Sequence, residues 1–302
     1  MTDSDPRSRI ALIGYGEVGQ ILAADLHAAG IQDLSAWDRD FPNAASLPSR
    51  AAAASGHVRI AAGMTDALGS RTLVISAVTA GNCVAAALAA APSLPRRAIY
   101  FDLNSVAPAT KSAAASAIEA GGGRFVEAAV MSPISPRRIA TSMLIGGPHA
   151  AAFEPVARSL GFSGVQLFDP VVGRASATKM CRSVIIKGLE SLLTESLLAA
   201  RHYGVEATVL ASLRDLFPHE DWERIAAYMI TRSLQHGRRR AEEMREAART
   251  VAEAGLEPSM TLACATRQNW SVAHRPDDNP EGLTALLDAL LTSSKTHVRG
   301  NV

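Results

Sequence analysis

The chain has 302 residues, of which 48% are hydrophobic, and this length is sufficient for two domains that each bury a core. Its 30 basic and 29 acidic residues nearly cancel, which excludes a general electrostatic attraction to nucleic acid or to an anionic membrane. A polar N-terminal stretch is followed by only a short apolar run, so we expect a cytoplasmic protein without a signal peptide or a membrane span. The expected partner is a small molecule.

Short apolar runs alternate with helical segments through the first 170 residues, a rhythm typical of a parallel sheet covered by helices. The runs that predict strands are Ile10–Ile13, Leu34–Trp37, Val58–Ala61, Thr72–Val78, Ala98–Leu103, Arg124–Ala129, Ser142–Ile145 and Val165–Phe168. Residues 1–170 are therefore predicted to form an α/β domain with a Rossmann-type doubly wound sheet.

The first of these strands runs into a glycine-rich turn and then into an amphipathic helical segment. The turn has the pattern GxGxxG and consists of Gly14, Tyr15, Gly16, Glu17, Val18 and Gly19. In this context the glycines permit a tight turn and a close approach of pyrophosphate, whose charge the helix N-terminus favours. We predict that these six residues bind a dinucleotide; the alternative is a glycine-rich turn without a ligand.

The second strand ends in Asp38 and Arg39, nineteen and twenty residues beyond Gly19. A carboxylate at this place accepts hydrogen bonds from the adenosine ribose and repels a 2′-phosphate, which favours NAD. The guanidinium of Arg39 could instead pair with a 2′-phosphate or stack on adenine, so NADP remains possible.

Ligands of open α/β sheets bind where the strands end. We therefore expect Val78, Thr79 and Asn104, which follow the fourth and fifth strands, to contact the cofactor. Ser105 and Ser132 are expected to contact the substrate.

Helical periodicity replaces the strand pattern after Asp169 and predicts a smaller all-α domain over residues 171–302. The expected helices are Ala175–Tyr203, Ala207–Phe217, His219–Gly255, Ser259–Ala273 and Glu281–Thr292, with a break near Gly237 in the third. This domain is expected to bind substrate and to form a dimer.

The long helix begins with a lysine in an otherwise apolar stretch, although arginine supplies nearly all other basic residues. Burial of Lys179 against a cofactor domain would depress its pKa and make it a general base. The alternative is a structural lysine that pairs with Glu190, and for Lys187 we favour the structural role. Arg182 is the expected anion-binding residue, whereas the run Arg238–Arg240 is expected to be solvated or part of an interface.

The chain carries no zinc-type ligand spacing among its eight histidines and three cysteines, so no metal site is predicted. Cys83, Cys181 and Cys264 lie far apart and are odd in number, which is typical of reduced thiols.

Together the glycine loop, Asn104, Ser105 and the segment Gly173–Ser183 resemble the β-hydroxyacid dehydrogenase superfamily, which includes 3-hydroxyisobutyrate and 6-phosphogluconate dehydrogenases. The resemblance covers nearly the whole chain and is greatest to a short branch with a poorly characterised C-terminal domain. It implies that Lys179 takes the proton of the substrate hydroxyl as hydride leaves for the nicotinamide. It also implies that Asn104 and Ser105 lie between nicotinamide and substrate, and that the helical domains form a homodimer.

Two departures from the family pattern concern the substrate. The family usually has a serine and two glycines after the sixth strand, whereas this chain has Ser132, Pro133 and Ile134, and proline has no amide hydrogen to donate. The asparagine that usually follows the lysine by one turn is Ser183 here. We therefore expect an anionic substrate held by Arg182 and Ser183 more than by backbone amides.

The sequence thus predicts an NAD-dependent dehydrogenase of a small hydroxy acid, with Lys179 as general acid and base. An imine reductase is an alternative because such enzymes share this architecture, although they commonly lack the lysine. A dinucleotide-sensing protein without turnover is the alternative outside the enzymes.

Overall fold

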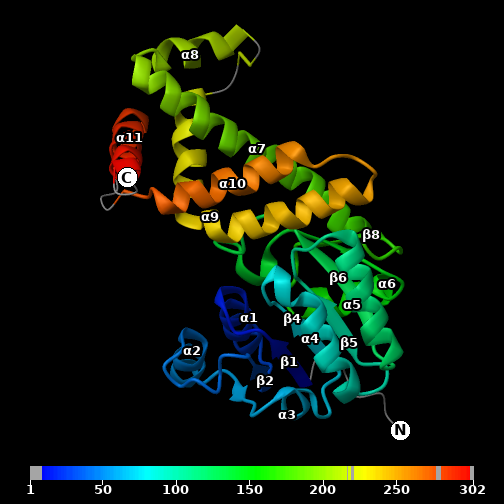
Figure 1. The fold of residues 1–302 in the computed structure, drawn as a ribbon. Helices are drawn as coiled ribbons and strands as arrows, with labels where there is room; N and C mark the ends of the chain where they lie inside the picture. The colour runs from blue at the N-terminus through cyan, green and yellow to red at the C-terminus, as the bar shows by residue number, and fades with distance from the viewer. Residues whose placement is uncertain (1–8, 216, 219–220, 277–279, 300–302) are drawn as a thin grey trace. The chain divides into compact units, whose positions relative to one another are not determined.

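The computed structural model describes residues 9–215, 217–218, 221–276 and 280–299 (Figure 1). It divides into two compact units between Met180 and Cys181. The division falls inside a long helix, whereas the sequence suggests a boundary near residue 170.

The first unit contains an eight-stranded sheet with the order β3-β2-β1-β4-β5-β6-β7-β8. Neighbouring strands are parallel except β6 and β7, which are antiparallel. The strands are β1 (Arg9–Ile13), β2 (Asp33–Trp37), β3 (Arg59–Ile60), β4 (Leu73–Ser76), β5 (Ile99–Asp102), β6 (Arg124–Val130), β7 (Met143–Gly146) and β8 (Val165–Asp169). Order 3-2-1-4-5-6 is that of a dinucleotide-binding sheet, which confirms the predicted fold class.

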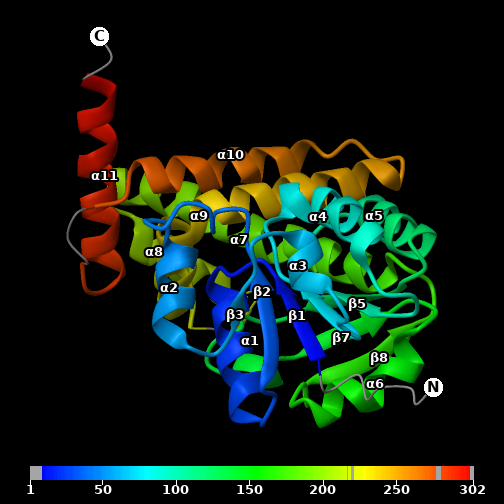
Figure 2. The ribbon, with the colours of Figure 1, turned by 90° about the horizontal axis from the view of Figure 1, so that it is seen from below.

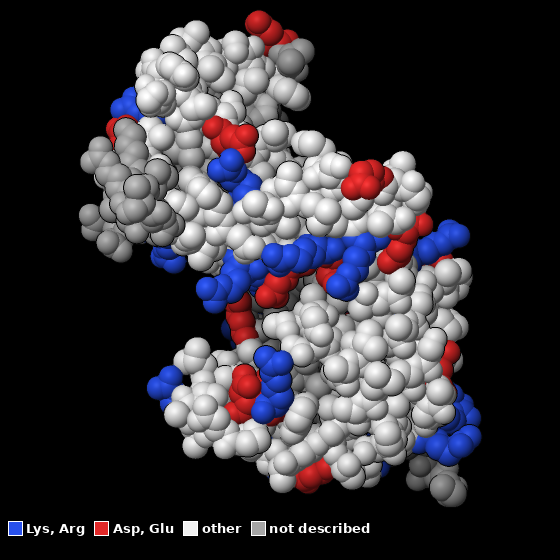
Figure 3. Space-filling model, viewed as in Figure 1, with Lys and Arg blue, Asp and Glu red and all other residues white. Residues whose placement is uncertain are grey.

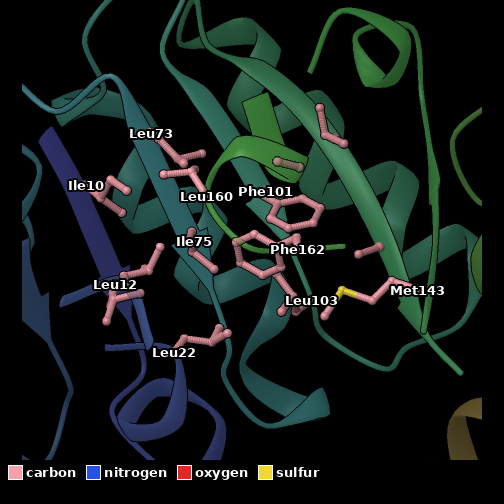
Figure 4. Packing of buried hydrophobic residues seen from close by; sticks show 14 of the residues in the cluster. Ile10, Leu12, Leu22, Leu73, Ile75, Phe101, Leu103, Met143, Leu160 and Phe162 are labelled. Carbon is pink, nitrogen blue, oxygen red and sulfur yellow. The ribbon is translucent and has the colours of Figure 1, made fainter. Parts of the chain in front are cut away.

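Both faces of this sheet are covered by helices, because successive strand residues point to opposite faces. Ile10 and Leu12 belong to one core, together with residues of α1 (Glu17–Ala28), α2 (Leu47–Ser55) and α6 (Ala150–Ser159) (Figure 4). Ala11 and Ile13 belong to the other core, which includes residues of α3 (Met64–Leu68), α4 (Cys83–Ala90) and α5 (Pro108–Ala120). The order of helices along the chain can be followed by colour in Figure 2.

The second unit is helical, as predicted. The long helix α7 (Arg174–Tyr203) enters it and is followed by α8 (Glu206–Ser212), α9 (Trp222–Glu253), α10 (Ser259–Ala273) and α11 (Leu283–Arg299). Its core is formed mainly by leucines of α7 and α11 together with Trp222, Ala226, Ile230 and Leu234 of α9. The predicted start of the third helix at His219 lies outside the described residues. No helix in the described part of the chain is long and apolar enough to cross a membrane.

The predicted break near Gly237 is wrong, because α9 is continuous through this residue. A Cβ atom at Gly237 would lie 2.3 Å from the carbonyl oxygen of Gln268 in α10. The glycine therefore allows two helices to pack closely. The sequence of one helix does not show whether a glycine permits such packing or ends the helix.

The expectation for the arginine run in α9 is wrong for Arg240, which is 8% exposed. Its guanidinium forms an ion pair with both carboxylate oxygens of Glu190 in α7, and Gln268 Nε2 donates to Glu190 Oε2 over 2.9 Å. Glu190 thus pairs with Arg240. Basic and acidic side chains lie side by side over the region of α9 (Figure 3). Within this helix, exposed Arg239 pairs with Glu243.

Candidate functional site

The glycine loop after β1 is closely packed at its first and last glycines and open at the middle one. Gly14 has φ +90°, and a Cβ atom there would lie 2.4 Å from the carbonyl oxygen of Ala77. At Gly19 an added Cβ would lie 2.2 Å from the carbonyl oxygen of Gly14, so neither position accepts a side chain. Around Gly16 no atom lies within 4 Å of such a Cβ, and no side chain caps α1 at this residue. The first turn of α1 therefore presents backbone N–H groups beside an open surface, which suits a pyrophosphate.

Asp38 ties the end of β2 to this loop. Its Oδ2 accepts a hydrogen bond from the Tyr15 backbone N–H at 2.7 Å, and its Oδ1 accepts one from the Asp40 N–H at 2.9 Å. The carboxylate thus supports the glycine loop as well as facing the adjoining pocket. Tyr15 itself is buried, and its hydroxyl lies 3.1 Å from Ser55 Oγ.

A pocket of about 320 Å³ adjoins the loop, wholly within the first unit. Its lining includes six of the predicted cofactor residues: Gly14, Gly16, Asp38, Arg39, Val78 and Thr79. Arg39 Nη1 donates to Asn82 Oδ1 over 3.1 Å, which places the guanidinium across one side of the pocket. The remaining loop residues Glu17, Val18 and Gly19 follow in the first turn of α1.

Several lining residues were not predicted from the sequence. They are Trp37, Asp40, Pro48, Met64, Ala77, Asn82, Ala85, Ala86 and Ala89. Most are apolar or small side chains from α2, α3 and α4, and such residues carry no chemical motif. Asn82 could have been predicted as a pocket residue, because it is polar and directly precedes α4 at the edge where β4 ends.

Asn104 lies just beyond β5, and its side-chain amide is buried. Its Oδ1 accepts a hydrogen bond from the Val78 N–H at 2.7 Å, and its Nδ2 donates to Ser76 Oγ at 3.0 Å and to Asp102 Oδ2 at 2.8 Å. Asn104 therefore joins the ends of β4 and β5 at the edge of the sheet that carries the glycine loop.

Lys179 and Ser105 are brought together in the first unit. Lys179, in the second turn of α7, donates from Nζ to Ser105 Oγ. The same loop is tied to α7 by Ser176, whose hydroxyl donates to the carbonyl oxygen of Val106. The hydroxyl of Ser105, the residue directly after Asn104, thus contacts the primary amine of Lys179, which lies 74 residues later in the sequence.

The other predicted substrate residues are Ser132, Arg182 and Ser183. Ser132 is exposed after β6, and its Oγ lies 2.9 Å from Thr141 Oγ1. In the second unit Arg182 is exposed, whereas Ser183 is buried and its Oγ accepts a hydrogen bond from Lys187 Nζ at 3.2 Å. Lys187 also forms an ion pair with Glu243 over 2.5 Å.

Glu127 of β6, which no sequence motif marks as functional, holds the first turn of α7. Its Oε1 accepts hydrogen bonds from the backbone N–H groups of Gly173 at 2.9 Å and Ala175 at 3.2 Å. These are N–H groups that a helix cannot satisfy itself. Burial raises the pKa of the Glu127 carboxyl above its usual value of 4.5, against the opposing effects of Lys111 and of these hydrogen bonds.

The raised pKa predicts a pH-dependent contribution to stability. Because the folded state binds the Glu127 proton more tightly than the unfolded chain, this contribution is complete below the ordinary pKa of 4.5 and is lost as the pH rises through the raised value. Relative to wild type, Glu127→Gln is expected to gain free energy of unfolding as the pH rises from 4.5 through the raised pKa. Urea denaturation at a series of pH values measures the difference, and parallel profiles would contradict the prediction.

The comparisons with known proteins agree with this geometry. Residues 9–173 match the model described as the NAD binding domain of 6-phosphogluconate dehydrogenase, and residues 200–271 match a domain of unknown function, DUF1932. The chain is 35% identical to a conserved hypothetical protein from Sinorhizobium meliloti 1021, with a TM-score of 0.77 over 95% of this chain and 97% of the other.

More distant structures share the fold alone. A 3-hydroxyisobutyrate dehydrogenase from Mycobacterium tuberculosis, described with L-serine, is 16% identical over 94% of this chain and 99% of its own, with a TM-score of 0.72. An imine reductase from Streptomyces aurantiacus is 18% identical over the same shares, with a TM-score of 0.52. Because the NAD-binding model matches more than half of the sequence, the chain belongs to the family that carries the NAD-binding domain of 6-phosphogluconate dehydrogenase.

Proposed function

We propose that this protein is an NAD-linked oxidoreductase that transfers hydride between a small anionic hydroxy acid and the nicotinamide. The observation that carries the proposal is the pairing of Lys179 Nζ with Ser105 Oγ, directly after Asn104 and at the strand edge that bears the glycine loop. An amine and a hydroxyl held at this edge suit the transfer of a proton to or from a substrate oxygen.

The glycine loop and its pocket fit a dinucleotide. Gly14 and Gly19 have no room for a Cβ atom, Gly16 is open, and Asp38 ends the neighbouring strand beside the pocket. A dinucleotide held by these residues would supply the hydride acceptor for the substrate carbon. Lys179 would take the hydroxyl proton on Nζ as the carbonyl forms, and Ser105 would orient that amine through its hydroxyl oxygen.

The experiment is a pair of assays on the purified protein. Reduction of NAD is followed with a panel of small hydroxy acids, each matched by its uncharged amide, and oxidation of NADH is followed with cyclic imines. The proposal expects turnover with acids and little with amides, because an anion is the group that Arg182 is proposed to bind. Turnover confined to imines would favour a C=N reductase, and nucleotide binding without any turnover would favour a sensor.

Cofactor choice is proposed to depend on Asp38. In the Asp38→Ala variant NADH should lose hydrogen bonds to a charged acceptor, worth roughly 1.5–3 kcal/mol, so its Kd should rise about tenfold or more. The 2′-phosphate of NADPH should no longer be repelled by the Asp38 carboxylate, so the ratio of the Kd of NADPH to that of NADH should fall. Calorimetric titration with both nucleotides measures this ratio. Asp40→Ala is the matched control, since Asp40 also lines the pocket and its removal changes the net charge equally. Wild type that binds NADPH more tightly than NADH would contradict the assignment.

A homodimer formed through the second unit is also proposed. This unit exposes large apolar side chains at Ile185, Leu192 and Met260, which are 71%, 57% and 65% exposed. Association with a second copy would remove these side chains from water. Light scattering at micromolar concentration should give twice the mass of 31.7 kDa, and a monomeric mass would refute the proposal.

A further inference from the structure

Lys111 is a buried cation that belongs to no sequence motif and has no part in the proposed reaction. It lies in the first turn of α5, its side chain is 1% exposed, and it forms an ion pair with Asp102, which is 0% exposed. Lys111 Nζ donates to Asp102 Oδ1 and to the Asp102 carbonyl oxygen at 3.0 Å, and it lies 3.5 Å from the Ala128 carbonyl oxygen. Burying two charges costs several kcal/mol per ion, so stability alone is a weak reason for such a pair.

The pair organises the turn that follows β5. Asp102 Oδ1 also accepts the Asn104 backbone N–H at 3.1 Å, and Asp102 Oδ2 accepts Asn104 Nδ2 at 2.8 Å. Acceptors that carry a full charge make shorter and stronger hydrogen bonds than neutral ones. Lys111 forms an ion pair with Asp102 in a buried place, and Asp102 in turn fixes both the backbone and the side chain of Asn104.

The partners of Asn104 decide which way its amide points. Asp102 can only accept and the Val78 N–H can only donate, so Nδ2 must face Asp102 and Oδ1 must face Val78. The second hydrogen of Nδ2 is directed to Ser76 Oγ at 3.0 Å. Both donor hydrogens are thus engaged within the protein, and Asn104 retains acceptor capacity at Oδ1 for a ligand.

This amide lies at the end of the sheet where the second nucleoside of a dinucleotide is expected. Val78 lines the pocket together with Asp38, which follows β2, while Asn104 follows β5. The strand order β2-β1-β4-β5 puts β4 and β5 on the opposite side of β1 from Asp38. A dinucleotide with its adenosine at Asp38 and its pyrophosphate at the glycine loop therefore extends toward Val78 and Asn104.

We propose that Lys111 and Asp102 are positioning residues for the nicotinamide riboside half of the cofactor, which they serve by holding Asn104 as a hydrogen-bond acceptor. The inference rests on the dinucleotide binding proposed above. Lys111 and Asp102 do not touch the cofactor; their effect passes through Asn104 and the Val78 backbone.

The test compares two ligands, of which only one contains the nicotinamide riboside. NAD contains the nicotinamide riboside, whereas ADP has only the adenosine and diphosphate portion. Lys111→Met combined with Asp102→Asn removes both charges at nearly constant volume, which avoids leaving one charge buried alone. The Kd of NAD is expected to rise about tenfold and that of ADP to change less than about twofold, since one organised hydrogen bond to a charged network is worth about 1.4 kcal/mol or more.

Two further variants keep the test decisive. Asn104→Ala removes the acceptor directly and should reproduce the tenfold loss for NAD, even if the double variant fails to fold. Phe153→Leu perturbs the core on the other face of the sheet and should change both Kd values equally. Equal effects on NAD and ADP in the double variant or in Asn104→Ala would overturn the positioning role. Wild-type protein that binds neither ligand would overturn the dinucleotide proposal and this inference with it.

Discussion

Lys179→Met is expected to lower turnover by about two to four orders of magnitude while the Kd of NAD stays nearly unchanged. Methionine keeps most of the side-chain length but has no group that can hold a proton, and Ser105 loses the donor that Lys179 Nζ supplies. Lys179→Arg should also fail, because a guanidinium does not release its proton near neutral pH. Steady-state rates and calorimetric binding of NAD measure the two effects separately.

Lys187→Met is the matched control for this prediction. It removes the same charge from the same helix, but Lys187 pairs with Glu243 and Ser183 and has no assigned part in the chemistry. We expect it to retain turnover within about tenfold of wild type when assayed below its unfolding temperature. Equal loss in both variants, or wild-type rates in Lys179→Met, would show that Lys179 is not the proton acceptor.

Glu190→Leu is expected to lower the free energy of unfolding by about 3–5 kcal/mol, because it leaves the buried Arg240 without a counter-charge. Gln268 loses its acceptor in the same change, so a contact among α7, α9 and α10 is broken. The double variant Glu190→Leu with Arg240→Met should recover most of the loss, since an apolar pair can replace a buried ion pair. Chemical denaturation followed by tryptophan fluorescence is informative here because Trp222 and Trp270 lie in this unit.

The control for this second prediction is Glu195→Leu, on the same helix. Glu195 pairs with Arg267, but its side chain is 68% exposed. An exposed pair contributes no more than about 1 kcal/mol, so this variant should be only slightly destabilised. Similar losses in Glu190→Leu and Glu195→Leu would mean that the burial of the Arg240 pair has no special effect.

The strands, the α/β fold class and the glycine loop could be predicted because their signals are local in sequence. Alternating apolar runs mark each strand, and the handedness of parallel connections leaves few topologies for them. Gly14 and Gly19 lie against backbone atoms of the adjoining strand end and of the same loop, while Gly16 is open, so the spacing of the three glycines carries the information.

Pairings between helices could not be predicted in this way. Helical spacing places Lys179, Ser183, Lys187 and Glu190 on one face of α7, yet it does not say what packs against that face. Glu190 finds Arg240, 50 residues later, and Gly237 permits close packing with Gln268, a contact between two helices. Lys111 and Asp102 gave no signal either, because a lysine in an exposed helix and a lysine in a buried ion pair look alike in a sequence.

The place where the chain divides has a consequence for how such proteins can be recombined. Lys179 lies before the division between Met180 and Cys181. Four hydrogen bonds fix the start of α7 to the rest of the first unit: those of Glu127 with Gly173 and with Ala175, of Ser176 with Val106, and of Lys179 with Ser105. A short helical stub is marginal in isolation, but here tertiary contacts supply its stability. A chimera joined after Met180 would thus inherit the amine together with the dinucleotide-binding half. The transplanted helical unit could then differ in sequence while the pairing of Lys179 with Ser105 is retained.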